Sequence, residues 1–353
     1  MKKHLIRLAR VLAFALVFVL AVNYLSLVFT PRTETQRFGD YSRISYSYRA
    51  EAPDTIDVFF VGDSSAYRSV SPMELWEKDG IAACMSGRGQ QTAAGAYKIV
   101  RELFEKQNPK IVFIETGMLF PGKNEDIKKA AIEQNNQHSV IRRVFFSGPE
   151  VFDDIGVSSV GYYFPLAKYH SRWKELTLRD FVDLNTIYYS EYHGYVLSGD
   201  VEAYTGGDAY MGNENAAPAQ MYDGAEKKLD AIVELCRSHG ALPVLFTAPC
   251  AMSWNYGKHN ATAAYAQKQS LTYRDYNLPG EIPELDWLTD SKDGGDHLNH
   301  PGAIKMTEHI RQDIQTLCPV PDRRTDPKYT ERFDHDDLIY RQQVQKELAP
   351  DKE

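Results

Sequence analysis

The sequence predicts an α/β domain with a mainly parallel sheet and helices on both faces, preceded by one N-terminal transmembrane helix. Two observations predict the domain. Short runs typical of buried strands alternate with amphipathic stretches typical of helices, and polar residues follow directly after the strands. A third observation predicts the transmembrane helix, because basic residues at the start of the chain precede a long apolar run.

Composition narrows the class of protein. The chain has 353 residues, of which 43% are hydrophobic and 25% charged, enough for the core of one large domain or two small ones. Its net charge of −8 argues against a nucleic-acid partner, because binding to phosphates needs a basic face.

The apolar run at 11–29 is long enough to cross a bilayer as a helix, and no cleavage site of small residues follows it. Residues 1–31 are therefore predicted to form a cytoplasmic stub and an uncleaved anchor. Because basic residues stay on the cytoplasmic side, the chain after Pro31 is expected outside. A cleaved signal peptide is the alternative, and a buried core helix is a weaker one. The basic residues are Lys2, Lys3, Arg7 and Arg10.

The elements after the anchor follow from local patterns. Residues 32–54 are polar and are expected to form a juxtamembrane spacer. The first strand is β-branched and aromatic and ends at Gly62, and a later amphipathic helix ends at Gly240 in a C-cap position. In chain order we expect a strand at 56–61, a helix with Pro72 near its start, a helix at 93–106, a strand at 111–114, a helix at 225–239, a strand at 242–246 and a last helix from about 301 to 317.

These elements suggest a catalytic domain at 55–318. Residues from about 124 to 222 break the alternation of strands and helices, so we expect an insertion there. Residues 319–353 are highly charged and are expected to form a solvated tail or a helix on the surface.

Four cysteines are spread along the chain. Outside the cell they could pair in three ways, and none has the C-x-x-C spacing of a zinc cluster. Cys236 and Cys250 stand in apolar surroundings, where a buried free thiol is the commoner outcome.

Ser64 is the candidate nucleophile. It lies in Gly62-Asp63-Ser64-Ser65, where a buried strand passes into a helix, so its hydroxyl is presented at the sheet edge. The backbone N–H groups at that helix start can also stabilise a developing oxyanion. The alternative is an ordinary turn or helix cap.

His297 is the candidate base, in a glycine-rich stretch just before the last helix. A nearby carboxylate can fix the tautomer of such a histidine. The alternatives are a surface loop with an Asx-turn and a metal site built from Asp293, Asp296, His297 and His300. Because no further ligands are evident elsewhere, we do not expect a metal. No soluble cofactor is implied either.

Together these two motifs resemble the SGNH, or GDSL-like, hydrolase family over roughly residues 56–316. The resemblance implies a three-layer, flavodoxin-like fold with the serine in the first motif and an Asp and a His late in the chain. Ser86-Gly87-Arg88-Gly89-Gln90 is similar to the second family motif, which makes Gly89 and Ser64 the expected backbone donors of the oxyanion hole. The ending at 297–303, His-Leu-Asn-His-Pro-Gly-Ala, resembles that of membrane-associated members.

The sequence departs from the family pattern in two places. The third family motif places an oxyanion-hole asparagine after a strand, but here Glu115 stands there and Asn124 is a distant substitute. The D-x-x-H motif would put an aspartate at the position of Gly294. Asp293 is favoured as the third triad member, with Asp296 as the alternative, because side chains of adjacent residues rarely point at each other.

A segment in the expected insertion resembles a Y-H-x-R-W stretch of the same membrane-associated proteins. It comprises Tyr169, His170, Arg172 and Trp173 with the intervening serine. Its aromatic, cationic and hydrogen-bonding groups suit the binding of a sugar or polymer. The alternative is a packed helix junction with Trp173 in the core.

The resemblance implies acyl transfer through Ser64, resolved by water in an esterase or by a polymer hydroxyl in an O-acyltransferase. The outward topology favours a cell-envelope polymer, such as peptidoglycan, teichoic acid or an exopolysaccharide, as substrate. Similar proteins serve D-alanylation of teichoic acid and O-acetylation of alginate beside a membrane-bound O-acyltransferase, which is therefore an expected partner. The alternative from another class is a catalytically inactive domain that binds a polymer or scaffolds such a complex.

Overall fold

The computed structural model describes residues 2–29, 47–120, 166, 169–174, 176–182 and 190–349. The chain divides into two compact units. One contains Met1–Asp40 and Lys128–Ile187, and the other contains Tyr41–Ile127 and Tyr188–Glu353. The described residues 190–222, which the sequence suggests as part of an insertion, thus belong to the same unit as the sheet.

The second unit is built on a five-stranded parallel sheet in the order β2-β1-β3-β4-β5. Since the strand order reverses beside β1, this is the flavodoxin-like arrangement of a doubly wound sheet. The strands are β1 (Val58–Gly62), β2 (Ala83–Gly87), β3 (Ile111–Glu115), β4 (Leu242–Thr247) and β5 (Thr272–Asp275). The predicted fold class is confirmed.

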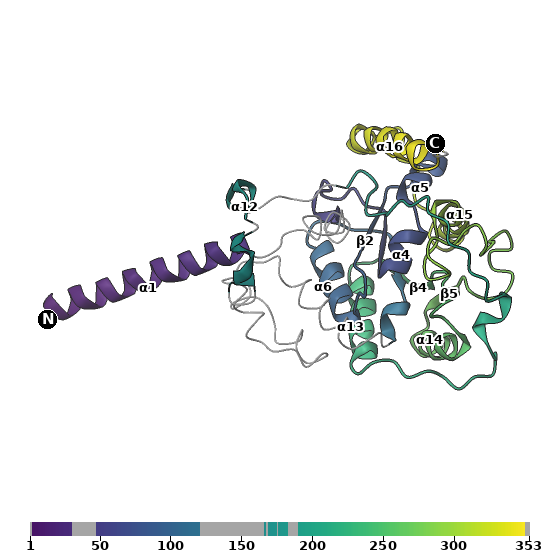
Figure 1. Cartoon of the computed structure of the whole chain (residues 1–353), viewed down its shortest axis with the longest axis horizontal. Coiled ribbons are helices and arrows are strands. Elements are labelled where there is room, and N and C mark those ends of the chain that lie inside the picture. The colour runs from purple at the N-terminus through teal and green to yellow at the C-terminus, as the bar shows by residue number, and fades with distance from the viewer. Residues whose placement is uncertain are drawn as a thin grey trace. The chain divides into compact units, whose positions relative to one another are not determined.

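Each face of the sheet carries its own apolar core, because successive side chains of a strand point to opposite faces. Along β1, Phe59 and Val61 enter one core, and Val58 and Phe60 enter the other. One core is covered by α6 (Ala93–Leu103), α13 (Ala225–Ser238) and α14 (Tyr256–Gln269), and the other by α4 (Ser64–Ser69), α5 (Pro72–Asp79) and α15 (His300–Leu317). Figure 1 shows α6 and α13 together on one side of the sheet and α15 on the other.

Three phenylalanines fill the centre of the second core. The ring centroids of Phe60 and Phe113 lie 5.0 Å apart in a stacked pair, and Phe246 meets both rings edge-on. Each ring comes from a different strand, so this contact fixes β1, β3 and β4 side by side.

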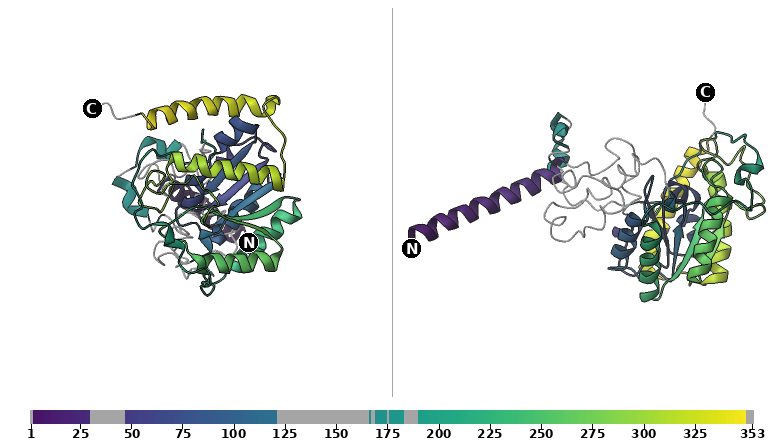
Figure 2. Two further views of the ribbon diagram at one scale, coloured as in Figure 1. Left: turned by 90° about the vertical axis from the view of Figure 1, so that its right-hand side faces the viewer. Right: turned by 90° about the horizontal axis from the view of Figure 1, so that it is seen from below.

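The charged C-terminal segment forms the helix α16 (Pro327–Glu347), which is the surface helix of the two alternatives. One of its faces is buried: Phe333 stacks on Trp76 of α5 at 4.7 Å, and Tyr340 is fully covered. Figure 2 shows α16 outside the helix layer that α5 and α15 form.

Three elements escape the sequence patterns. The strands β2 and β5 form the two edges of the sheet, and β2 has no β-branched or aromatic residue. The helix α14 is rich in alanine and polar residues and has no continuous apolar stripe.

The helix α1 (Lys2–Phe29) of the first unit is long and apolar enough to cross a membrane. The same unit contains two further short elements in its described part, η3 (His170–Lys174) and α12 (Leu178–Val182).

Candidate active site

Ser64 is presented where β1 ends and α4 begins. The side chain of Asp63 caps the helix, since its Oδ1 accepts a hydrogen bond of 2.9 Å from the backbone N–H of Ser65. Ser64 follows as the first helical residue, and its half-buried side chain lines a pocket at the carboxyl end of the sheet. This is the strand-to-helix setting that the sequence predicts for the serine.

Glycine at position 62 is required by a close approach between strands. A Cβ there would lie 2.4 Å from the Cβ of Glu115 and 2.7 Å from that of Ala66. Gly87 at the end of β2 is required in the same way, because its Cβ would lie 2.1 Å from the carbonyl oxygen of Gly62. These contacts let the ends of three strands converge on the pocket.

The loop before α15 carries His297. A β-bridge between Ser291 and Leu298 closes the loop, and Gly294 and Gly295 adopt φ values of +72° and +97°. Only glycine takes such left-handed conformations readily. The tight turn folds Asp293 back towards His297 although four positions separate the two residues.

Asp293 is held against His297 by two contacts. Its Oδ2 lies 2.7 Å from Nδ1 of His297, and its Oδ1 accepts the backbone N–H of His297 at 2.8 Å. Burial would raise the pKa of Asp293, but the hydrogen bonds and charge of His297 hold it below its usual value. A carboxylate that stays ionised keeps the proton on Nδ1 and leaves Nε2 of His297 to accept another.

Asp296, the alternative partner, is placed less well. Its Oδ2 lies 3.5 Å from Nδ1 of His297, while its Oδ1 is the acceptor for the thiol of Cys250 at 3.6 Å. His300 points elsewhere, since its Nδ1 lies 3.1 Å from the hydroxyl of Tyr195. Among the described residues, no group of three or more His, Cys, Asp or Glu side chains could hold a metal ion.

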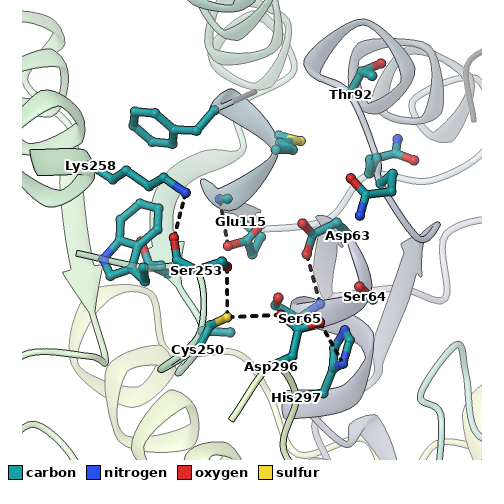
Figure 3. A pocket seen from close by; sticks show the side chains of 18 of the residues that line it. Asp63, Ser64, Ser65, Thr92, Glu115, Cys250, Ser253, Lys258, Asp296 and His297 are labelled. Carbon is teal, nitrogen blue, oxygen red and sulfur yellow. Dashed lines mark hydrogen bonds and ion pairs between the residues drawn. The ribbon is translucent and has the colours of Figure 1, made fainter. Parts of the chain in front are cut away.

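A pocket of about 170 Å³ joins these residues. Ser64 and His297 both line it, and Figure 3 draws them towards the same side of the view. Its volume is below the range of about 300–1,000 Å³ of pockets for drug-sized ligands, so it suits only a small chemical group. The lining consists of Asp63, Ser64, Ser65, Gln90, Gln91, Thr92, Glu115, Gly117, Met118, Phe120, Tyr222, Thr247, Ala248, Cys250, Ser253, Trp254, Lys258, Asp296 and His297.

Lys258 supplies a cation that the sequence reasoning missed. Its Nζ donates a hydrogen bond of 2.6 Å to the carbonyl of Ser253 and lies 5.6 Å from the ring centroid of Phe120. Burial lowers the pKa of Lys258, and the nearby acidic groups offset this only in part. The residue belongs to α14, the helix without a recognisable apolar stripe, so no local signal marks it.

Glu115 is the second functional candidate that was missed. It ends β3, where the family pattern has its asparagine region, and it is only 1% exposed. Its Oε1 accepts the backbone N–H of Gly117 at 2.8 Å. Burial and the neighbouring charge of Asp63 raise the pKa of Glu115 well above its usual value, and burial likewise raises the pKa of Asp63. In the sequence, the signal that could have identified Glu115 is a single carboxylate at the end of an otherwise apolar strand.

The cysteines carry free thiols. Cys250 lies in the pocket wall, where its Sγ is 3.0 Å from the hydroxyl of Ser253. Burial raises the pKa of Cys250 to about 12, so it is not a thiolate nucleophile.

The other predicted residues lie outside the pocket lining. Gly89 is exposed in the turn after β2, and the turn contributes Gln90 and Gln91 to the lining instead. Its role as an oxyanion donor stays a prediction. Asn124 lies outside the described residues. The four residues of the Y-H-x-R-W stretch, Tyr169, His170, Arg172 and Trp173, belong to the first unit, whereas the pocket is lined by the second.

No family model matches the sequence, and no curated protein matches it. Among solved structures the chain is similar to a Bacteroides fragilis protein described as a "putative acylhydrolase", with 14% identity, 79% of this chain and 97% of that chain covered, and a TM-score of 0.37. It is also similar to a GDSL-like lipase from Bacteroides thetaiotaomicron, with 14% identity, coverage of 78% and 98%, and a TM-score of 0.37. Likeness this distant carries no chemistry to this chain.

Proposed function

We propose that this chain is a serine-dependent esterase or O-acyltransferase of the SGNH type, in which Ser64, His297 and Asp293 form the catalytic triad. The observation that carries the proposal is the double contact between Asp293 and His297 beside a pocket that Ser64 also lines. Orientation of the imidazole by a carboxylate is what the base of a serine nucleophile needs.

The reaction follows from the orientation of the imidazole. With Nδ1 held by Asp293, Nε2 of His297 takes the proton of the Ser64 hydroxyl as Oγ attacks the ester carbonyl. Collapse of the tetrahedral intermediate expels the alcohol, which takes that proton from His297, and leaves an acyl group on Ser64. Water or an acceptor hydroxyl then attacks the acyl-enzyme and gives its proton to His297. The bond between the acyl carbon and Ser64 Oγ breaks, Oγ takes the proton back from His297, and the acid or the new ester is released.

The oxyanion is assigned to the backbone N–H groups of Ser64 and Gly89. Ser64 lies at the first position of α4, where N–H groups have no acceptor within the helix. Gly89 follows β2, the neighbour of β1 in the sheet.

The substrate we propose is an ester on a cell-envelope polymer, with a membrane-bound O-acyltransferase as partner. The support is α1, whose length and apolar composition suit an anchor with the catalytic domain outside the cytoplasm. The small pocket supports a short acyl group, such as acetyl, rather than a fatty acid.

Labelling with a fluorophosphonate probe tests the proposal. The purified chain should be labelled at Ser64, Ser64→Ala should not be labelled, and His297→Ala should react at least about 100-fold more slowly. Adding a polysaccharide acceptor to an activated acetyl ester then separates transfer from hydrolysis. An unlabelled wild-type chain would refute the catalytic proposal and leave the inactive polymer-binding domain.

A further inference from the structure

The segment that contains η3 and α12 is attached to the end of the membrane helix. The guanidinium of Arg172 donates a hydrogen bond of 2.8 Å to the carbonyl of Phe29, the last residue of α1. Tyr24 donates from its hydroxyl to the carbonyl of Phe181 at 3.3 Å. Because helix ends leave their last carbonyls without partners inside the helix, Arg172 acts as a cap for α1.

The same segment exposes large apolar side chains. Trp173, Leu178 and Val182 are 65%, 80% and 67% exposed, and Phe181 is 38% exposed. Lys174 lies beside them, with its Nζ 5.6 Å from the ring centroid of Trp173. Aromatic and aliphatic side chains with flanking lysine are the composition of segments in the interface of a bilayer.

We propose that residues 170–174 and 176–182 lie in the lipid headgroup region where α1 leaves the bilayer, with Trp173, Leu178 and Val182 inserted towards the acyl chains. The occupant of this surface is lipid, because the surface continues directly from the end of a helix that can span a membrane. The inference rests on the proposed anchor. It assigns Trp173 to lipid and Arg172 to a structural contact, in place of a sugar site.

Tryptophan fluorescence tests this inference, since the chain has four tryptophans and the other three are buried or half-buried. The full chain is reconstituted into phosphatidylcholine vesicles with acyl chains brominated close to the headgroup. Bromine should quench a component of the wild-type emission that is absent in Trp173→Phe but kept in the control Trp287→Phe.

The outcomes separate the two claims. A chain that fails to float with the vesicles refutes the anchor. A chain that floats, with equal quenching in wild type and Trp173→Phe, refutes the interfacial segment and assigns the surface to a protein partner instead.

Two carboxyl groups, those of Asp63 and Glu115, line the pocket beside Ser64. Glu115 Oε2 is buried and has no hydrogen-bond partner in the part of the chain that the structure describes. A Cβ on Gly117 would lie 3.2 Å from this oxygen and 3.4 Å from Asp63 Oδ2, so the two carboxyl groups flank the same point. Both groups lie near this point because β1 pairs with β3, which brings Gly62, the residue before Asp63, beside Glu115.

The charge of Asp63 raises the pKa of Glu115, because full negative charges on neighbouring buried carboxyl groups repel each other. The cation nearby is Lys258, whose ammonium is hydrogen-bonded to Ser253. The charge of Asp296 raises the pKa of Asp63, and the charge of His297 lowers it. Binding of one proton by the pair removes the repulsion and, on Glu115, gives Oε2 a hydrogen to donate.

We propose that Asp63 and Glu115 share one proton, and that Glu115 through it positions Asp63, the cap of the helix that begins with the nucleophile. Loss of the shared proton at alkaline pH then displaces Asp63 and, with it, Ser64. Glu115 is a positioning residue in this assignment, and the inference rests on the proposed nucleophile.

The rate of labelling of Ser64 by the fluorophosphonate across pH 5 to 10 tests the pair. The wild-type rate should fall at alkaline pH. Glu115→Gln, which keeps a donor without a titrating proton, should stay within about threefold of wild type at neutral pH and lose that alkaline fall. Glu115→Ala should react at least about tenfold more slowly at every pH. An alkaline fall that persists in Glu115→Gln, or full activity in Glu115→Ala, would overturn the inference.

If the wild type does not react with the probe, Ser64 is refuted as nucleophile but the shared proton is not. A stability measurement then tests the shared proton independently of labelling. A carboxyl group with a raised pKa in the folded state stabilises the fold below its ordinary pKa, and that contribution is lost as pH rises. The melting temperature of wild type should therefore drop between pH 5 and pH 9 more steeply than that of Glu115→Gln. Equal slopes would refute the shared proton.

Discussion

Asp293 holds His297 through both of its carboxylate oxygens, one on the backbone N–H at 2.8 Å and one on the ring Nδ1 at 2.7 Å. The two contacts fix the position of the loop and the orientation of the imidazole together. They also give a structural reason to prefer Asp293 to Asp296, the residue next to His297, as the acid of the proposed triad.

Replacing Asp293 with Asn should lower the labelling rate of Ser64 by about 10³- to 10⁴-fold, because the amide favours the wrong imidazole tautomer. Asp296→Asn should cost less than about tenfold. Both rates are measured with the fluorophosphonate probe, and near-equal melting temperatures would confirm that the variants fold. A larger loss in Asp296→Asn than in Asp293→Asn would overturn the assignment.

Gly62→Ala should destabilise the protein by about 1–3 kcal/mol, the range for overpacking, because its Cβ would collide with Glu115 and Ala66. The matched control is Gly89→Ala, where the nearest atom to a Cβ is the hydroxyl of Tyr67 at 3.8 Å. That substitution should change the free energy of unfolding by less than about 0.5 kcal/mol. Urea unfolding measures both, and equal effects would contradict the close approach of β1 and β3.

Stability should depend on pH through His193, which is fully buried between two carboxylates. Its Nδ1 lies 3.1 Å from Glu51 and its Nε2 lies 3.0 Å from Asp336. Burial alone lowers the pKa of His193, but these carboxylates outweigh it and raise the pKa above 6.5, its ordinary value. The charged ring therefore stabilises the fold fully below about pH 6.5, and this contribution is lost as pH rises through the folded pKa.

His193→Gln should therefore cost about 3–5 kcal/mol at pH 6, as for a broken buried pair, and less at pH 9. Denaturant unfolding at several pH values gives the slopes. The control is His335→Gln, since this exposed ring also contacts Asp336 yet should leave the pH dependence intact. An unchanged slope in His193→Gln would show that another group titrates.

Asp275 is hydrogen-bonded to Trp254, a residue of the pocket lining. It accepts hydrogen bonds from Trp254 Nε1 at 2.8 Å and from the backbone N–H of Asn277 at 3.0 Å, and its Oδ2 lies 2.7 Å from Nδ1 of His259. Asp275→Ala should cost about 3 kcal/mol, because it leaves buried donors without an acceptor, and should also slow labelling of Ser64. Glu226→Ala, in an exposed ion pair, should cost less than about 1 kcal/mol. A cost no larger than that of the control would contradict this role for Asp275.

Local sequence patterns were enough to predict the inner strand β1 and the helix α13. The strand before Ser64 is apolar along its whole length and ends in glycine, so its burial and its end are both written in a few adjacent residues. The helix α13 shows its apolar stripe and its terminal glycine in the same way. The edge strands β2 and β5 lack this signal: β2 has no β-branched or aromatic residue, and β5 has only four residues, of which two are charged.

The choice between two carboxylates for the proposed triad could not be made from local sequence. The sequence offers Asp293 and Asp296, and only the left-handed turn at Gly294 and Gly295 determines which carboxylate reaches Nδ1 of His297. Backbone conformations of this kind depend on closure of the loop by the bridge between Ser291 and Leu298.

The sequence by itself determined the α/β class, the apolar N-terminal helix and the two candidate residues Ser64 and His297. Each of these depends on spacing and polarity within a short stretch. The tertiary structure decided which residues surround the candidate nucleophile. Glu115 and Lys258 reach the pocket from β3 and α14, because the order of strands in the sheet brings their ends together. That order is set by packing between segments far apart in the chain, which no local pattern records.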